Sequence, residues 1–487
     1  MSFMPHSSPP SSGLLPEQQN ALAEFSHRQH LRILAYAGAG KSYTAAAIAE
    51  FAASRWLYGY YWCFNVSTRV SMERRLKNTS GVIVRGTGQM ACAHAKSRGY
   101  SGQQLDPEIN FRCREHLKPP QGNGPETPES ALAIDETLKR FYRSVDFEPA
   151  PHHVPYFPSF FPSRRWADGE AEQIADRTWR VALWIWHQQQ FPGNALPMGG
   201  AALEKLWSLQ CSGLGRDFVI IDEAQDTAPP VLALLARLGR AGLQVVLIGD
   251  SHQAIYGWRG AENALDAPWI ERTSRLSQTF RFGAGIAEHV NPLLQAMGEM
   301  VPLIGNPNKT SQVLPAGASD VVIARTNAGV FTAASEFIEA GRSVCAKGCK
   351  AALAAFLVDV KKLQNGQKAE QVHDLMGFTS WQSVVDFAKT PPGADLSSSV
   401  GLVEKFGLSS MWNIVKKLET NEVPGGALVT TCHKAKGDEW PVVRISNDFE
   451  VKGEKIPDEQ RRLFYVAATR AQHRLIMDPL ILSQYSR

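Results

Sequence analysis

The chain has 487 residues, of which 44% are hydrophobic and 20% are charged, and its net charge is +4. This length predicts roughly two to four domains, and the composition is ordinary for a globular protein. No apolar run reaches the roughly 18 residues of a membrane span, so we expect no membrane partner. The seven cysteines are an odd, dispersed set, which argues against a disulfide framework and favours a reducing cytoplasm. The positive charge favours a polyanionic partner without establishing one.

The first part of the chain alternates helical and strand patterns. Residues 1–13 lack an apolar signal core, and we expect them to be a short disordered leader. LLPEQQNALAEF (14–25) is predicted to be a helix, and ILAYA (33–37) is a buried strand pattern. Two more strand patterns follow at YYWCFNV (60–66) and GVIVRGT (81–87). Strands that alternate with helices predict a parallel α/β sheet.

This alternation stops at about residue 95 and returns at DFVIIDEAQD (217–226) and LQVVLIGD (243–250). It appears again at DVVIARTN (320–327) and ALVTTCHKAKG (427–437), which flank about 100 residues of mostly helical pattern. The C-terminal stretch EQRRLFYVAATRAQHRLIMDPLIL is expected to be a helix followed by a strand. The sequence therefore predicts two α/β cores, each interrupted by an insertion.

An aromatic stretch, FEPAPHHVPYFPSFFPSRRW (147–166), stands inside the first insertion. It could contact DNA at a duplex junction, with Arg164 and Arg165 on phosphates, but we favour packing inside the inserted domain. We expect His152 and His153 to belong to a loop rather than to a metal site.

The loop AGAGKS (37–42), after the first predicted strand, has the residues of a phosphate-binding loop. In such a loop, successive backbone N–H groups and a helix N-terminus converge on phosphate oxygens. Gly38 and Gly40 permit the backbone angles that the loop needs. Lys41 would reach the β and γ phosphates, and Ser42 would hold Mg²⁺. A glycine-rich turn between a strand and a helix is the alternative for an isolated match.

Acidic residues follow a second buried strand pattern, VIIDEAQD. Asp222 suits Mg²⁺, directly or through water. Glu223 suits polarising an attacking water. Acids often cap strand ends, but capping alone does not explain why both elements occur in this order in one chain.

GDSHQAIYGWRGA (249–261) places Gln253 just beyond a strand, where it can sense a γ-phosphate. Tyr256, Trp258 and Arg259 follow, and rings beside a cation are typical of a groove for single-stranded nucleic acid. Arg281 and Arg470 are candidate arginine fingers, although a surface ion pair is the usual role of any one arginine.

Taken together and in this order, the elements resemble the UvrD/Rep-type superfamily 1 DNA helicases, from about residue 14 to 475. In that family the phosphate-binding loop commonly begins with Ala, as it does here at Ala35. The TFRFG and HKAKG stretches and the short Phe64–Asn65 motif are most similar to the F-box DNA helicase branch and its bacterial relatives.

The resemblance implies ATP and Mg²⁺ as cofactors, and it assigns roles to individual positions. Residues expected to bind ATP are Gln18, Ala37, Gly38, Ala39, Gly40, Lys41, Ser42, Tyr43, Phe280 and Glu439. Residues expected in catalysis are Lys41, Asp222, Glu223, Gln253, Arg281 and Arg470, and Ser42 and Asp222 would hold Mg²⁺. Residues expected to contact DNA are Phe64, Asn65, Thr87, Tyr256, Trp258, Arg259, Thr431, His433 and Lys436.

Four positions depart from the family pattern. Val66 stands where a Lys is usual, and Gln89 stands where the T-x-H motif has His. Asp438 stands in place of Leu, and Tyr43 in place of Arg or Thr. These departures affect the expected DNA contacts rather than ATP hydrolysis, because every phosphate-handling residue is present.

The resemblance also implies an α/β architecture of two RecA-like domains with parallel sheets, which clamp ATP between them and each carry an inserted, mainly helical subdomain. The expected divisions are the first RecA-like domain at 14–94 and 206–283, its insertion at 95–205, the second RecA-like domain at 284–344 and 426–487, and its short insertion at 345–425.

We therefore expect an ATP-dependent helicase or translocase on single-stranded DNA or a single/double-strand junction, moving 3′→5′ by resemblance. It would be cytoplasmic, and associated with the nucleoid if prokaryotic. Two alternatives stay open: a translocase that removes proteins from DNA without unwinding it, and a nucleotide-gated DNA-binding subunit of a larger complex. The sequence does not name a protein partner.

Overall fold

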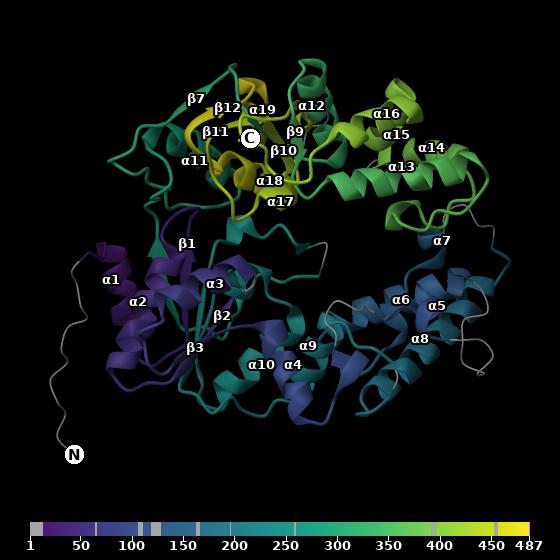
Figure 1. Ribbon diagram of the computed structural model, residues 1–487. Helices are drawn as coiled ribbons and strands as arrows, with labels where there is room; N and C mark the ends of the chain where they lie inside the picture. The colour runs from purple at the N-terminus through teal and green to yellow at the C-terminus, as the bar shows by residue number, and fades with distance from the viewer. Residues whose placement is uncertain are drawn as a thin grey trace, which may run out of the picture. The chain divides into compact units, whose positions relative to one another are not determined.

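The structure, a computed structural model, describes residues 13–63, 66–105, 111–117, 128–161, 166–194, 196–257, 260–390, 393, 396–451 and 456–486 (Figure 1). The chain forms two compact units. The first comprises Met1–Pro155 and Gly169–Ser277, and the second comprises Tyr156–Asp168 and Gln278–Arg487. Among the described residues, no helix combines the length and the apolarity that crossing a membrane requires.

The first unit is built on a six-stranded sheet with the order β3-β2-β4-β5-β1-β6, in which every pairing is parallel. Its strands are β1 (Leu31–Ala35), β2 (Gly59–Cys63), β3 (Val82–Gly86), β4 (Phe218–Ile221), β5 (Gln244–Gly249) and β6 (Arg272–Leu276). Every residue of β4 and β5 is buried, as expected for central strands with both faces covered.

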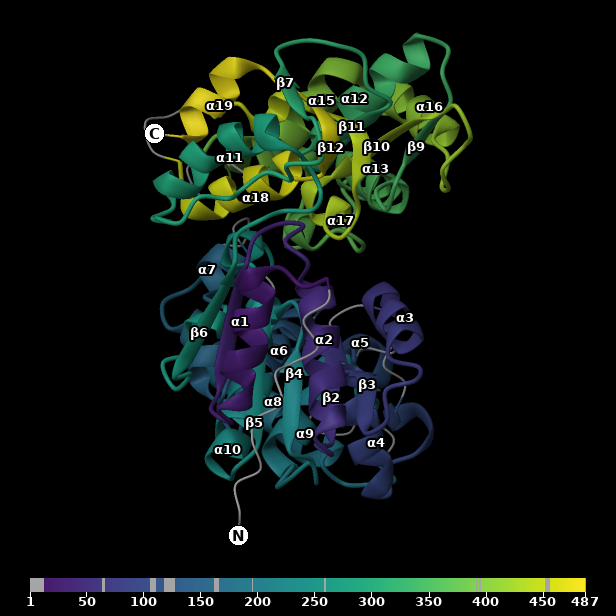
Figure 2. The same cartoon turned by 90° about the vertical axis from the view of Figure 1, so that its left-hand side faces the viewer.

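Helices cover both faces of this sheet. Figure 2 shows α1 and α2 side by side on one face, and an apolar cluster that includes Leu206, Leu234 and Val245 joins α9 and α10 to the other. Pro16 and Pro229 begin α1 and α10, where a missing N–H costs nothing. The helices of the unit are α1 (Pro16–Ser26), α2 (Lys41–Ser54), α3 (Val66–Arg75), α4 (Thr87–Ser97), α5 (Cys113–His116), α6 (Pro128–Tyr142), α8 (Glu170–Gln189), α9 (Gly200–Gln210) and α10 (Pro229–Arg240).

The second unit has its own six-stranded parallel sheet, with the order β7-β12-β11-β8-β10-β9. Its strands are β7 (Gln312–Leu314), β8 (Val321–Ala324), β9 (Val344–Ala346), β10 (Ala427–Thr431), β11 (Trp440–Ile445) and β12 (Ala471–Ile476). Its helices are α7 (Phe157–Phe160), α11 (Ala284–Ala296), α12 (Asn327–Glu339), α13 (Lys350–Gln364), α14 (Trp381–Ala388), α15 (Ser397–Phe406), α16 (Leu408–Lys417), α17 (Cys432–Ala435), α18 (Asp458–Ala468) and α19 (Pro479–Tyr485).

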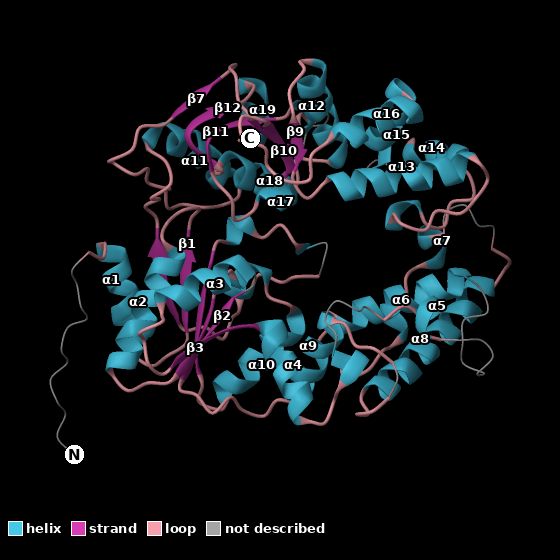
Figure 3. Ribbon diagram, in the orientation of Figure 1, coloured by secondary structure: helices cyan, strands magenta, loops and turns pink. Residues whose placement is uncertain are grey.

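Helices α13 to α16 form a group without a strand among their described residues (Figure 3). Their apolar residues, such as Leu357 and Met411, share one buried cluster with Phe331 of α12. This group lies in the stretch where the sequence predicts the second insertion. The division into four subdomains stays a prediction.

Two features differ from the sequence-based expectations. The chain ends in a helix, α19, after the expected final strand. The aromatic stretch is divided between the units. Residues 147–155 pack within the first insertion, where the Trp186 indole donates to the Phe147 carbonyl and His153 contacts Phe141. Residues 156–168 belong to the second unit, where Gly377 lies against Phe161. Phe157 and Phe161 are 3% and 1% exposed. The prediction of packing inside the first insertion is therefore confirmed for residues 147–155 and wrong for the described residues that follow, while Arg164 and Arg165 lie outside the described residues.

Candidate functional site

The predicted phosphate-binding loop lies between β1 and α2. Gly38 and Gly40 have φ values of 72° and 80°, a left-handed conformation that side chains rarely adopt. Gly40 is the N-cap of α2, so the loop delivers backbone N–H groups to the start of a helix. Ala37 and Ala39 are buried beneath the turn, and Ala35 ends β1 as expected. The loop therefore has the backbone form that holds phosphate.

Lys41 and Ser42 face the acidic pair that follows β4. Lys41 Nζ lies 3.7 Å from Glu223 Oε1. Ser42 Oγ lies 3.4 Å from Asp222 Oδ2. The parallel strands β1, β5 and β4 end at one edge of the sheet, which explains why residues 180 positions apart in the chain meet here. Four of the predicted catalytic and metal-binding residues are thus brought together.

Asp222 is fixed from two sides. Its Oδ2 accepts a hydrogen bond of 2.5 Å from Tyr61, a buried residue of β2, and its Oδ1 accepts one of 2.9 Å from the Glu223 backbone N–H. Burial raises the pKa of Asp222 above its usual range, and the neighbouring Glu223 carboxylate adds to this effect. A cation at this position would stabilise the ionised Asp222 carboxylate against both its burial and the neighbouring negative charge. No sequence pattern indicates that Tyr61 contacts Asp222.

The conformation of Glu223 is unusual for a residue with a side chain, because its φ is 52° and its ψ is 44°. Its Oε2 accepts a hydrogen bond of 2.6 Å from Gln225 Nε2. Gln225 Oε1 in turn accepts the Asp250 backbone N–H at 3.1 Å, and Asp250 Oδ2 accepts Gln253 Nε2 at 2.8 Å. A hydrogen-bonded chain therefore joins Glu223 to Gln253, the two residues predicted to handle the attacking water.

Gln18 is also close to the loop. Its Nε2 donates to Thr44 Oγ1 at 3.0 Å, and Thr44 Oγ1 donates to the Gly40 carbonyl at 3.1 Å. Gln18 thereby supports the N-terminus of α2. Tyr43, where the resembled family usually has Arg or Thr, lies under the guanidinium of Arg75 at 4.2 Å from the ring centroid. A cation therefore stands beside this position even though residue 43 is not basic.

The two predicted arginine fingers lie in the second unit. Arg281 Nε donates to Glu439 Oε2 at 2.5 Å, and its NH1 donates to the Thr469 carbonyl at 2.9 Å. Burial alone would raise the pKa of Glu439, but the charge and hydrogen bond of Arg281, with a hydrogen bond from Gln472, lower it overall. Phe280, the predicted adenine contact, is 40% exposed.

Arg470 is 1% exposed and follows α18. Its guanidinium donates to the Val466 carbonyl at 2.8 Å, to Thr469 Oγ1 at 3.0 Å and to the Asp438 carbonyl at 3.3 Å. These three neutral acceptors hold the guanidinium in place. Arg281 and Arg470 thus share the segment around Thr469, one through its carbonyl and the other through its hydroxyl.

The predicted DNA contacts are only partly described. Phe64, Asn65, Trp258 and Arg259 lie outside the described residues. The others that are described are Thr87 at the start of α4, Tyr256 after β5, Thr431 at the end of β10, His433 in α17 and Lys436 after it. Asp438, which departs from the family pattern, forms an ion pair with Lys347 at 3.0 Å.

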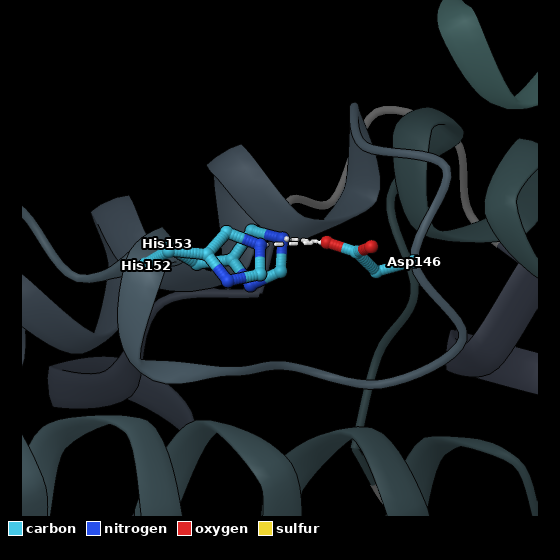
Figure 4. Close-up of side chains that lie close together, drawn as sticks. All are labelled: Asp146, His152 and His153. Atoms are coloured by element: carbon cyan, nitrogen blue, oxygen red, sulfur yellow. Dashed lines mark hydrogen bonds and ion pairs between the residues drawn. The ribbon is translucent and has the colours of Figure 1, made fainter.

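Asp146, His152 and His153 form a separate cluster in the first unit, and both imidazole rings face the carboxylate (Figure 4). The two Nε2 atoms lie 2.7 and 3.1 Å from Asp146 Oδ2. His153 Nδ1 accepts the Ala150 backbone N–H, so the proton of the neutral ring resides on Nε2. A metal ion at His153 Nε2 would require the ring proton to move to Nδ1, which would cost the hydrogen bond from Ala150. That these histidines belong to a loop rather than to a metal site stays a prediction.

Comparison with known proteins adds to this geometry. A family model described as the UvrD/REP helicase N-terminal domain matches residues 216–265, which contain Asp222, Glu223 and Gln253. A second, described as the UvrD-like helicase C-terminal domain, matches residues 426–477, which contain Glu439 and Arg470. The chain is therefore similar to UvrD-like helicases in two separate stretches. Its two parallel sheets are consistent with the two RecA-like domains of UvrD-like helicases.

Curated relatives of this UvrD-like chain are DNA helicases by name. It is 26% identical to F-box DNA helicase protein 1 of Schizosaccharomyces pombe, across 99% of this chain and 59% of the relative. It is 27% identical to F-box DNA helicase 1 of Gallus gallus, across 71% of this chain and 37% of the relative. Escherichia coli DNA helicase IV is 36% identical across 16% of this chain and 12% of its own length. The chain thus spans less than two thirds of each relative.

Proposed function

We propose that this chain is an ATP-dependent DNA helicase or translocase that moves on single-stranded DNA, in the 3′→5′ direction by resemblance. The observation that carries the proposal is the meeting of Lys41, Ser42, Asp222 and Glu223 at one edge of a parallel sheet, beside a left-handed glycine loop. A phosphate cradle with a paired acid is what nucleotide hydrolysis requires. The names of the relatives support DNA as the substrate.

ATP and Mg²⁺ fit the residues present. The Ser42 hydroxyl and the Asp222 carboxylate are oxygen ligands of the kind that Mg²⁺ prefers. When bound, the ion neutralises charge on the β and γ phosphates. Tyr61 holds Asp222 in its orientation, and Lys41, once a phosphate replaces Glu223 as its partner, leaves Glu223 available to a water.

In the proposed cycle, Glu223 accepts a proton from the attacking water, and the chain through Gln225 and Asp250 connects it to Gln253. Arg281 and Arg470 supply positive charge to the γ-phosphate from the second unit. Loss of that phosphate removes their partner, so the nucleotide state biases closure between two conformations. Aromatic and basic residues would hold and release bases as closure alternates.

Steady-state ATP hydrolysis with and without a single-stranded DNA oligonucleotide tests the proposal. We expect DNA to stimulate hydrolysis, and Glu223→Gln to retain ATP binding while losing about 10²–10⁴-fold in turnover. Asp217→Asn, a change of an acid at the opposite end of β4, is the matched control. Wild-type turnover in Glu223→Gln would exclude Glu223 as the base.

One observation favours translocation without unwinding as a second candidate. Val66, which stands where the family usually has a lysine, is 68% exposed, so a phosphate contact of the resembled motors is replaced by an apolar side chain. Parallel assays of strand separation and of displacement of a protein roadblock distinguish the two. ATP binding without DNA-stimulated hydrolysis would instead support a nucleotide-gated subunit of a larger complex.

A further inference from the structure

Thr87 and Glu204 form a partly buried hydrogen bond next to the acidic pair. The Thr87 hydroxyl donates to Glu204 Oε1 at 2.5 Å, although the two residues are 117 positions apart. Thr87 begins α4, directly after β3, and Glu204 lies on α9, which packs along α4. β2 is the neighbour of both β3 and β4, so Thr87 and Asp222 follow strand ends on either side of it.

A cavity of about 50 Å³ connects these groups, and Glu204, Thr87, Asp222 and Glu223 are all part of its wall. Trp62 also lines it, and this fully buried residue has an indole N–H without a hydrogen-bond partner among the described residues. A cavity of this size with polar walls has room for water, which would satisfy the indole. Glu204 is itself partly exposed, so it can exchange a proton with solvent.

Thr87 has one hydroxyl proton, and in this structure it is donated in a hydrogen bond to Glu204. A DNA phosphate only accepts hydrogen bonds, so Thr87 can contact one only by turning that proton outward. An ionised, partly buried Glu204 would then lose its hydrogen-bond donor while it lies close to the negatively charged phosphate, which is costly. A protonated Glu204 has no such cost, because its O–H can donate to the oxygen of Thr87 while Thr87 donates to the phosphate.

We infer that Glu204 is a positioning residue for the DNA contact of Thr87, and that it takes up one proton from solvent when Thr87 engages a phosphate and returns it on release. This inference deepens the proposed function and rests on it, because it takes Thr87 as a DNA contact. Burial supports it independently by raising the pKa of Glu204, an effect that the hydrogen bond from Thr87 only partly offsets.

Other titratable groups lie near Thr87 and Glu204, and one of them provides a control variant. The cavity wall includes Cys63, Asp222, Glu223 and Asp226. On α4, His94 contacts Gln210 of α9 at 3.4 Å, and burial lowers its pKa. Lys205, next to Glu204 on α9, instead donates to the Ser144 carbonyl at 2.8 Å. His94→Gln therefore tests a titrating group at the same helix interface without altering the cavity.

The test is the equilibrium binding of a fluorescent oligodeoxythymidine without nucleotide, from about pH 5.5 to about pH 8.5. The wild type is expected to bind more tightly as the pH falls, by up to about tenfold per pH unit for one linked proton. Glu204→Gln mimics the protonated acid, because its amide can donate to Thr87. At the higher pH, Glu204→Gln should bind the oligonucleotide at least as tightly as the wild type. Its affinity should no longer increase as the pH falls, whereas the affinity of His94→Gln should still increase.

Variants of Thr87 complete the design. Thr87→Ser keeps the hydroxyl, so its affinity for the oligonucleotide should depend on pH as in the wild type. Thr87→Val lacks the hydroxyl and should lose this pH dependence. The double variant Thr87→Val/Glu204→Gln should bind like Thr87→Val alone, because Glu204 acts through Thr87. An unchanged pH dependence in Glu204→Gln, or losses that multiply in the double variant, would overturn the inference. A wild type that binds no single-stranded DNA at any pH would instead contradict the proposed function.

Discussion

Arg281 and Glu439, 158 positions apart in the chain, form an ion pair with a separation of 2.5 Å within the second unit. The side chain of Arg281 is 13% exposed, and Glu439 also accepts a hydrogen bond of 3.0 Å from Gln472. The guanidinium is therefore oriented by fixed partners before any ligand binds. For a residue proposed to reach a γ-phosphate, such orientation lowers the entropy that must be lost when the phosphate arrives.

Replacing Arg281 tests this assignment. Arg281→Ala should lower the kcat of ATP hydrolysis by about 10³-fold or more, the usual contribution of an arginine finger. Arg281→Lys should restore little, because one ammonium cannot reproduce the bonds to both Glu439 and the Thr469 carbonyl. Arg342→Ala, which breaks an exposed ion pair with Asp320 in the same unit, is the control and should leave kcat within about twofold. Equal effects of the two alanine variants would contradict the assignment.

Tyr61→Phe tests the support of Asp222. Loss of the hydroxyl removes a 2.5 Å hydrogen bond to the carboxylate that is proposed to hold Mg²⁺. We expect the Mg²⁺ concentration for half-maximal hydrolysis to rise about tenfold or more, with a smaller change in kcat at saturating Mg²⁺. Tyr60→Phe removes a hydroxyl from the adjacent residue of β2 and serves as the control. A titration of activity against Mg²⁺ that is the same for both variants would show that Tyr61 is only a packing residue.

Gly249→Ala tests the chain from Glu223 to Gln253. A Cβ atom at Gly249 would lie 2.2 Å from Gln225 Oε1, the atom that accepts the Asp250 backbone N–H. The side chain must move, so we expect a loss of about 1–3 kcal/mol in unfolding free energy and a loss of hydrolysis. Gly401→Ala, in helix α15 with no atom within 4 Å of the added Cβ, should be neutral or slightly stabilising. Chemical denaturation and ATPase assays on both variants check this, and a fully active, stable Gly249→Ala would refute it.

The buried Lys205 should make the unfolding free energy of the protein depend on pH. It is fully buried, and burial lowers its pKa to about 8, although the charge of Asp146 partly opposes this. Between about pH 8 and about pH 10.4, the unfolded chain therefore holds a proton that the folded chain has released, so stability from this residue rises with pH. We expect the unfolding free energy of the wild type, relative to Lys205→Met, to increase by about 3 kcal/mol across this range. Urea denaturation at both pH values measures the difference, and a constant difference would contradict the prediction.

Much of the fold could be predicted because its signals are local. Buried runs such as FVII at 218–221 and VVLI at 245–248 read as central strands, and the glycines of the phosphate loop indicate a left-handed turn. Strand β6, with the sequence RTSRL, has no apolar run, because Thr273 and Arg275 alternate with the buried Ser274 and Leu276 at a sheet edge. Its assignment depends on pairing with β1, which no local pattern reveals.

The candidate site was predictable to a similar degree. Motif residues that carry charge, such as Asp222 and Arg470, could be chosen from sequence because their chemistry restricts the residue type. Tyr61, Glu204 and Gln225 could not, because their roles depend on contacts with residues that are distant in the chain or on side-chain direction. Nothing in the sequence distinguishes Tyr61 from Tyr60, whereas the pleat of β2 gives them opposite faces.

Residues 156–168 belong to the second unit, yet both flanking stretches belong to the first. During synthesis, Phe157 and Phe161 leave the ribosome long before Gly377, against which Phe161 packs. Until then Phe161 lacks this contact, and the aromatic segment would be available to a chaperone or to aggregation. A fragment that ends at Ser277 would retain this segment without its partner. The first unit is therefore expected to be soluble on its own only when residues 156–168 are replaced by a polar linker.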